Sequence, residues 1–258
     1  MAYSSYTPPK DEIKLLREKI EFNYIGGYLF WGEEEYLKNY YREVLKKKVR
    51  DLGFEEFNLI SVSFEKGDTF DDIEASLDTP PVFSTVKLVE VTGLDILTLK
   101  KEEEKRLLEI AHSRAEDTVL IFTFYSDELD LKPRKTKERA IIKKLSEDLF
   151  FVEFPRQSKE KLLSWTDKIF SSQSLHISDV NIVKMIELCD YSMTRLKSES
   201  DKLVCRAKQN SFNQVPSEWV SEMVKPSSEN VIFELGDAIA LLDKKRAFDV
   251  FENVVAQN

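Results

Sequence analysis

The segment TVLIFTFY, residues 118–125, is apolar at almost every position, and it constrains the fold more than any other part of the chain. Strands with this pattern are buried on both faces, which is typical of parallel sheets covered by helices. Parallel strands need long crossover connections, which are usually helices. The rest of the domain should therefore alternate between strand and helix patterns.

That alternation continues as far as Pro155. Further strands are predicted in a segment ending at Phe30 and at residues 58–64, 85–91 and 149–154. Amphipathic helices are predicted at residues 10–20, 33–50, 69–79, 100–114 and 134–148. Thr69 is the expected N-cap of the third helix, which Pro80 and Pro81 should end. The order predicts an α/β domain with a mostly parallel sheet in residues 1–155.

The pattern changes after Pro155, and no further strand is predicted. Four amphipathic helices are expected at residues 158–172, 178–190, 192–208 and 215–225, and Ser158, Ser178 and Ser192 are expected at the starts of the first three. They predict a small helical domain in residues 156–226. Two more helix patterns fill residues 229–258, after a hinge-like KPSSE segment. Two helices alone bury their apolar faces poorly, so we expect residues 227–258 to be the incomplete beginning of a third domain.

The first strand and helix, in YLFWGEEEYL, have the order of a nucleotide-binding unit but not its chemistry. A phosphate loop needs several glycines, a Lys and a Ser or Thr, whereas this turn holds only Gly32. Glu33, Glu34 and Glu35 are expected in the first helical turn, where they suit the helix dipole and repel a phosphate. The turn therefore predicts no bound nucleotide and no other cofactor.

Amino-acid composition narrows the classes of protein to which the chain can belong. The chain has 258 residues, 42% hydrophobic and 33% charged, which is typical of a globular protein, and its net charge of −9 argues against a uniform coating of nucleic acid. Neither a signal peptide nor a membrane span is predicted, so we expect a cytoplasmic protein. Cys189, Cys205, His112 and His176 fit no metal-ligand spacing, and no nucleophilic motif predicts catalysis.

The strongest basic cluster is KPRKTKER, residues 132–139. We favour a solubilising loop and helix start. The alternative is contact with DNA phosphates or with an acidic neighbouring subunit, through the cationic side chains Lys132, Arg134, Lys135, Lys137 and Arg139.

Two sequence segments resemble those of one protein family. YLFWGEEEYL and SENVIFELGDAIALLDKKRAFDVF, with its run at Phe233–Ile239, are similar in order and separation to the delta subunit of bacterial DNA polymerase III, and the likeness covers nearly the whole chain. The resemblance implies an AAA+-like α/β domain, a small helical domain and a helical collar, without ATPase activity. It also implies that the chain opens the ring of the sliding clamp (beta). The implied partners are the gamma/tau and delta prime subunits, reached through the collar, and primed DNA.

The resemblance also implies a clamp-binding site in LDTPPVFSTVKLVEV, where an apolar pair follows a short helix. Val82 and Phe83 match that pair, and Leu77 is the expected support; Val82 is shorter than the Leu often found in the family. Without the resemblance, a Phe beside a strand favours a place in the core. Two other classes stay open: an active ATPase, and an AAA+-like non-catalytic scaffold that binds DNA or replication proteins without clamp contact.

Overall fold

The computed structural model describes residues 11–96, 98–112, 116–124 and 136–226, with isolated helical positions at 239, 244 and 248; for residues 136–139 it describes the backbone only. The chain divides into two compact units, Met1–Pro155 and Arg156–Asn258. The helices predicted in residues 229–258, and with them the expected collar, lie outside the described residues except at those three positions.

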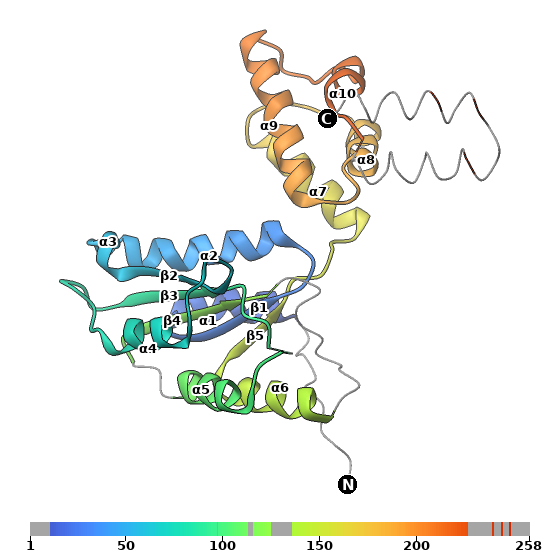
Figure 1. Cartoon of the computed structure of the whole chain (residues 1–258). Coiled ribbons are helices and arrows are strands. Elements are labelled where there is room, and N and C mark those ends of the chain that lie inside the picture. The colour runs from blue at the N-terminus through green and yellow to red at the C-terminus, as the bar shows by residue number, and fades with distance from the viewer. Residues whose placement is uncertain are drawn as a thin grey trace. The chain divides into compact units, whose positions relative to one another are not determined.

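The first unit is built on a parallel sheet of five strands in the order β2-β3-β4-β1-β5 (Figure 1). The strands are β1 (Gly26–Trp31), β2 (Leu59–Ser63), β3 (Lys87–Thr92), β4 (Thr118–Thr123) and β5 (Phe150–Glu153). The central strand β4 is buried at all six positions, as its apolar sequence predicts. The predicted parallel α/β sheet is therefore confirmed.

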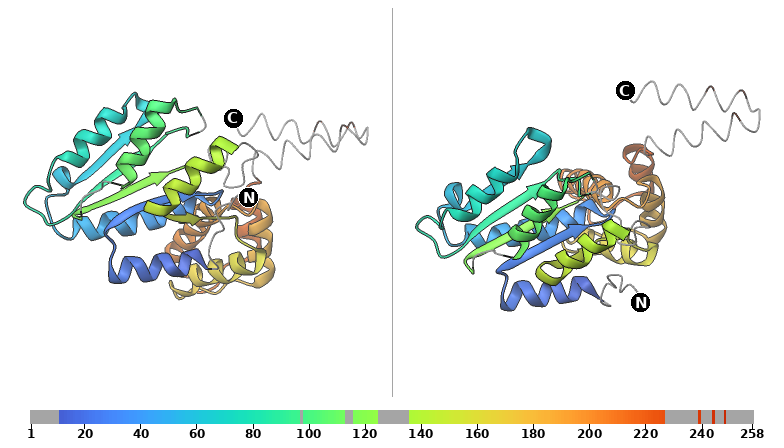
Figure 2. Two further views of the ribbon diagram at one scale, coloured as in Figure 1. Left: turned by 90° about the horizontal axis from the view of Figure 1, so that it is seen from below. Right: turned by 60° about the horizontal axis from the view of Figure 1, so that its bottom comes forward.

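Helices cover both faces of this sheet, and Figures 1 and 2 show the three layers from different sides. The helical segments of the unit are α1 (Glu12–Phe22), α2 (Glu35–Arg50), α3 (Glu55–Asn58), η1 (Phe64–Lys66), α4 (Phe70–Asp78), α5 (Lys101–His112) and α6 (Thr136–Asp148). The apolar sides of α1 and α2 pack on one face, and those of α4, α5 and α6 pack on the other. The short segments α3 and η1 were not predicted.

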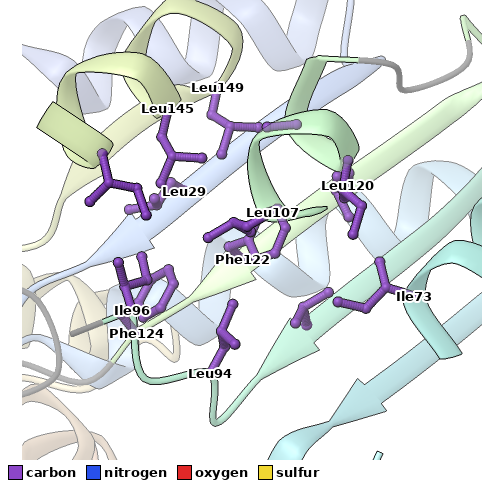
Figure 3. Packing of buried hydrophobic residues seen from close by; sticks show 14 of the residues in the cluster. Leu29, Ile73, Leu94, Ile96, Leu107, Leu120, Phe122, Phe124, Leu145 and Leu149 are labelled. Carbon is purple, nitrogen blue, oxygen red and sulfur yellow. The ribbon is translucent and has the colours of Figure 1, made fainter. Parts of the chain in front are cut away.

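Strand residues alternate between the two cores. Leu29 of β1 and Phe122 of β4 face α5 and α6, where Leu107 and Leu145 meet them (Figure 3). Their neighbours along each strand belong to the other core, beneath α1 and α2. This two-residue period is the normal consequence of the β pleat, and it places both faces of the sheet out of water.

The second unit is helical, as predicted. Its helices are α7 (Lys159–Ser171), α8 (Asp179–Leu188), α9 (Met193–Gln209) and α10 (Ser217–Met223). The expected caps are confirmed at the first three, where the hydroxyl groups of Ser158, Ser178 and Ser192 accept hydrogen bonds from backbone N–H groups three residues on. In the described part of this unit the only β pairing is an isolated bridge between His176 and Gln214. None of the helices in the described residues combines the length and apolar character that crossing a bilayer requires.

Candidate functional site

The segment that joins α4 to β3 contains the site predicted from the sequence. Asp72 caps the start of α4 by accepting a 2.7 Å hydrogen bond from the backbone N–H of Thr69. The helix ends at Asp78, before Pro80 and Pro81, as expected. Lys87, at the start of β3, is buried, and its Nζ donates to the carbonyl oxygens of Ser76, at 2.7 Å, Leu77, at 2.6 Å, and Thr79. These bonds satisfy carbonyl groups that a helix end otherwise leaves without partners.

Phe83 points into solvent. Its exposed fraction is 81%, and its φ of +50° lies in the left-handed region that non-glycine residues rarely adopt. Val82, next to it, is half-buried. Leu77 is also partly buried and packs against the core beneath α4, so it supports the segment from below. Leu77 thus lies in the last turn of α4, and Val82 and Phe83 lie in the connection that follows it; of the three, only Phe83 is exposed.

Asn58, the last residue of α3, holds Val82 in place. Its amide group accepts a 2.8 Å hydrogen bond from the N–H of Val82 and donates to the Val82 carbonyl at 2.9 Å. Its other amide hydrogen bond goes to the carbonyl of Phe54, at 3.0 Å. Asn58 itself is fully buried, and its three hydrogen bonds to Phe54 and Val82 are partly buried, so the amide is shielded from water on its own side and fixes the backbone of both loops.

A second exposed phenylalanine contacts Phe83. The ring of Phe54 lies 5.3 Å from that of Phe83, between centroids, at an interplanar angle of 43°. Phe54 is 49% exposed and also has a positive φ, +55°. Phe57 and Leu52, in the same stretch of chain, are exposed too. Sequence reasoning missed Phe54, because its proximity to Phe83 depends on a contact across 29 residues of chain; Phe54 and Phe83 together are called the aromatic pair below.

The turn after β1 packs closely against the backbone of Phe154, the residue after β5. Gly32 has φ +108°, and a Cβ there would lie 2.6 Å from the carbonyl oxygen of Phe154. The N–H of Glu34 donates to that same oxygen at 2.8 Å, and the N–H of Tyr36 donates to the Glu34 carboxylate at 3.3 Å. Two of the backbone N–H groups at this helix start, those of Glu34 and Tyr36, therefore already have acceptors within the protein. One detail of the prediction was wrong: α2 begins at Glu35 with Glu34 as its cap, so Glu33 precedes the helix.

A buried lysine also lies near this turn. Lys38 is fully buried, forms an ion pair with Glu35, and donates from Nζ to the carbonyl oxygen of Phe124 at 2.8 Å. Its charge is thus neutralised within the protein, and it is not presented to a ligand. The carboxylates of Glu33, Glu34 and Glu35 lie at this end of the sheet, and the nearby Lys38 is already paired with Glu35. The local charge therefore disfavours a bound anion.

The remaining predicted candidates are dispersed or not described. In the basic cluster, Lys132, Arg134 and Lys135 lie outside the described residues, and the side chains of Lys137 and Arg139 do as well. No group of His, Cys, Asp and Glu suited to a metal ion occurs among the residues that the structure describes.

Comparisons with known proteins give one family-model match and several solved structures with a similar fold. The family model for the delta subunit of DNA polymerase III matches residues 28–155. A solved structure of the Bacillus subtilis DNA clamp loader delta protein is 21% identical, covers 95% of this chain and 72% of that chain, and has a TM-score of 0.61. No curated protein matches the chain.

Two Thermotoga maritima structures share the fold at lower identity. The Holliday junction branch migration motor RuvB is 11% identical, with a TM-score of 0.55, covering 92% of this chain and 77% of that chain. A protein related to the DNA polymerase III gamma subunit is 13% identical, with a TM-score of 0.50, covering 95% and 77%. The expected AAA+-like α/β unit followed by helices is thereby confirmed.

Proposed function

We propose, from the premise that residues 28–155 belong to the DNA polymerase III delta-subunit family, that this chain is the clamp-opening subunit of a bacterial clamp loader. It binds the sliding clamp and holds one interface of the ring open, so that the ring can be placed around primed DNA. The observation that carries the proposal is Phe83, an exposed aromatic residue on a segment held by hydrogen bonds with two buried residues, Asn58 and Lys87.

Phe83 has the properties of an interface anchor. Aromatic side chains that enter apolar pockets dominate the binding energy of many interfaces. An aromatic residue that is 81% exposed and has a rare backbone conformation adds little to the stability of the isolated chain. The same residue offers a projecting apolar group to a binding partner. Val82 widens the contact at the base, and Leu77 supports it from the core.

Ring opening follows from binding only if the chain discriminates between two states of the clamp. A ligand shifts an equilibrium by the difference between its affinities for the two states. The chain must therefore bind the open ring more tightly than the closed ring. ATP hydrolysis is assigned to the partner subunits gamma/tau, and the closed turn around Gly32 and Glu34 supports that assignment.

The test is binding of this chain to the sliding clamp of its own organism, measured by isothermal titration calorimetry. The Val82→Ala, Phe83→Ala double variant should bind at least about tenfold more weakly, because it loses a central aromatic anchor. Phe22→Ala is the matched control: Phe22 is 84% exposed, and its helix α1 packs against β5, at the far edge of the sheet from β2.

The same proteins test ring opening as release of the clamp from circular DNA. The natural chain and Phe22→Ala should accelerate release, and the double variant should not. If the natural chain is folded but does not bind the clamp, the proposed function is wrong. If it binds and the double variant binds equally well, the anchor is wrong.

A further inference from the structure

The two rings of the aromatic pair come from different loops, yet they form one surface. Phe54 directly precedes α3, which leads into β2, and Phe83 precedes β3, the strand paired with β2. Their centroid separation of 5.3 Å falls within the range in which aromatic rings attract one another. Phe54 is 49% exposed and Phe83 81%, so both residues are accessible to a partner.

One buried side chain joins the two loops. Asn58 uses both amide hydrogens, one on the carbonyl of Phe54 and one on that of Val82, while its oxygen accepts from the N–H of Val82. Val82 directly precedes Phe83, so a single amide fixes the backbone of one aromatic residue and the immediate neighbour of the other. A shift of one loop against the other breaks at least one of these hydrogen bonds and leaves a polar group of the buried Asn58 without its partner, which is costly.

Phe54 and Phe83 both have an unfavourable backbone conformation. Phe54 and Phe83 both have φ near +50°, a region that bulky side chains seldom occupy. Such residues persist where their surroundings determine them, and they gather at functional positions. A pair fixed before binding loses less conformational freedom when a partner arrives, which favours affinity.

We propose that Phe54 and Phe83 act as one composite anchor for the sliding clamp, with Asn58 as the residue that sets their relative position. The inference rests on the proposed function and extends it. The complementary site on the clamp is an apolar pocket wide enough for two rings, rather than a slot for one side chain. Phe54 is then a binding residue, and Asn58 a positioning residue that acts through both loops.

The first test is a double-mutant cycle measured as affinity for the clamp. Phe54→Ala should weaken binding at least about fivefold, and Phe54→Tyr, which keeps the ring, should bind within about twofold of the natural chain. The Phe54→Ala, Phe83→Ala variant should lose less than the product of the two single losses, by a factor of about three or more, because each ring supports the other.

The second test concerns Asn58 and uses fluorine NMR of protein labelled with fluorophenylalanine. In Asn58→Ala the resonances of Phe54 and Phe83 should move toward the positions of unstructured rings, and clamp affinity should fall at least about fivefold. Glu90→Gln, a buried change in β3 that touches neither loop, is the control: it should leave both resonances and the affinity unchanged.

The outcomes separate the two proposals. If Phe83→Ala weakens binding while Phe54→Ala does not, or if the two losses simply multiply, the composite anchor is overturned and the clamp-binding function stands. If Asn58→Ala leaves both resonances in place, Asn58 does not position the pair. If the natural chain fails to bind the clamp, both proposals fall.

Discussion

Lys87 shows how a single buried residue sets the geometry of the exposed surface. Only 2% of it is accessible, and removal from water lowers the pKa of its ammonium group. It is nevertheless matched to its surroundings, because an ammonium group has three hydrogens and three carbonyl oxygens accept them. Those carbonyls belong to the end of α4, from which the Pro80–Phe83 segment departs.

We predict that Lys87→Met lowers the free energy of unfolding by about 1–3 kcal/mol. The methionine keeps the apolar stem but removes the donor from three partly buried carbonyl groups, and lost hydrogen bonds of this kind cost about this much. Urea unfolding followed by circular dichroism measures the change. Lys105→Met, at a side chain 77% exposed, should change the value by less than about 0.5 kcal/mol. Equal losses in the two variants would contradict a structural role for the Lys87 ammonium.

At the scale of elements, α2 and β3 are joined by charge as well as by packing. Glu90 of β3 is buried on the face that α2 covers, where Arg42 donates to its carboxylate and Lys46 lies 2.8 Å from Oε2. Burial acts to raise the pKa of Glu90, but the hydrogen bonds from Arg42 and Lys46 outweigh it, and the pKa lies below its ordinary value of 4.5. The charged form is therefore the one that the fold stabilises.

This pKa shift predicts an acid-dependent contribution to stability. Because the folded pKa is below the unfolded pKa, the contribution is complete above about pH 4.5 and is lost as pH falls through the folded pKa. Glu90→Gln should lower the free energy of unfolding by about 1–3 kcal/mol at pH 7. The gap between the variant and the natural chain should narrow below about pH 4. A gap that stays constant from pH 7 to pH 3 would contradict the assignment; Glu109→Gln, at an exposed ion pair, is the control.

The sequence was sufficient to predict the long elements, and the reason is periodicity. The apolar run of β4 and the helical spacing of α2 extend over enough residues to indicate their type and burial. The segment α3 has four residues, too few for any period. The bonds of Asn58 to Val82 span 24 residues of chain, so only the folded structure reveals them. The exposure of Phe83 is a further case, because residue type alone favours the core.

At the scale of the whole molecule, two compact units each contain a buried core, and the two cysteines both lie in the second unit. Cys205 is exposed, whereas Cys189 is fully buried. Burial raises the pKa of the Cys189 thiol to about 11, from an ordinary value of 9.0. Because the thiolate is the reactive form, Cys189 is protected in two ways: its burial keeps reagents away, and its raised pKa keeps the thiol protonated.

We predict that one thiol per chain reacts quickly with a disulfide reagent at pH 8, and that the other reacts at least on the order of a hundredfold more slowly, in line with its smaller thiolate fraction. Mass spectrometry of peptides identifies which cysteine is labelled. The slow rate should be the same in Lys87→Met, because that change weakens the first unit only. Faster labelling of Cys189 in that variant would show that the two units unfold together.

The direction of the strands separates two regions of the first unit. The aromatic pair lies where β2 and β3 begin, and the closed turn around Gly32 lies where β1 ends. Because all five strands are parallel, these regions lie at opposite ends of the strands. A strand of six residues separates the two ends by roughly 20 Å along its axis. Selection can therefore act on one end without disturbing the other. The loops that carry the aromatic pair can be changed without altering the turn around Gly32, and the turn can be changed without altering the pair.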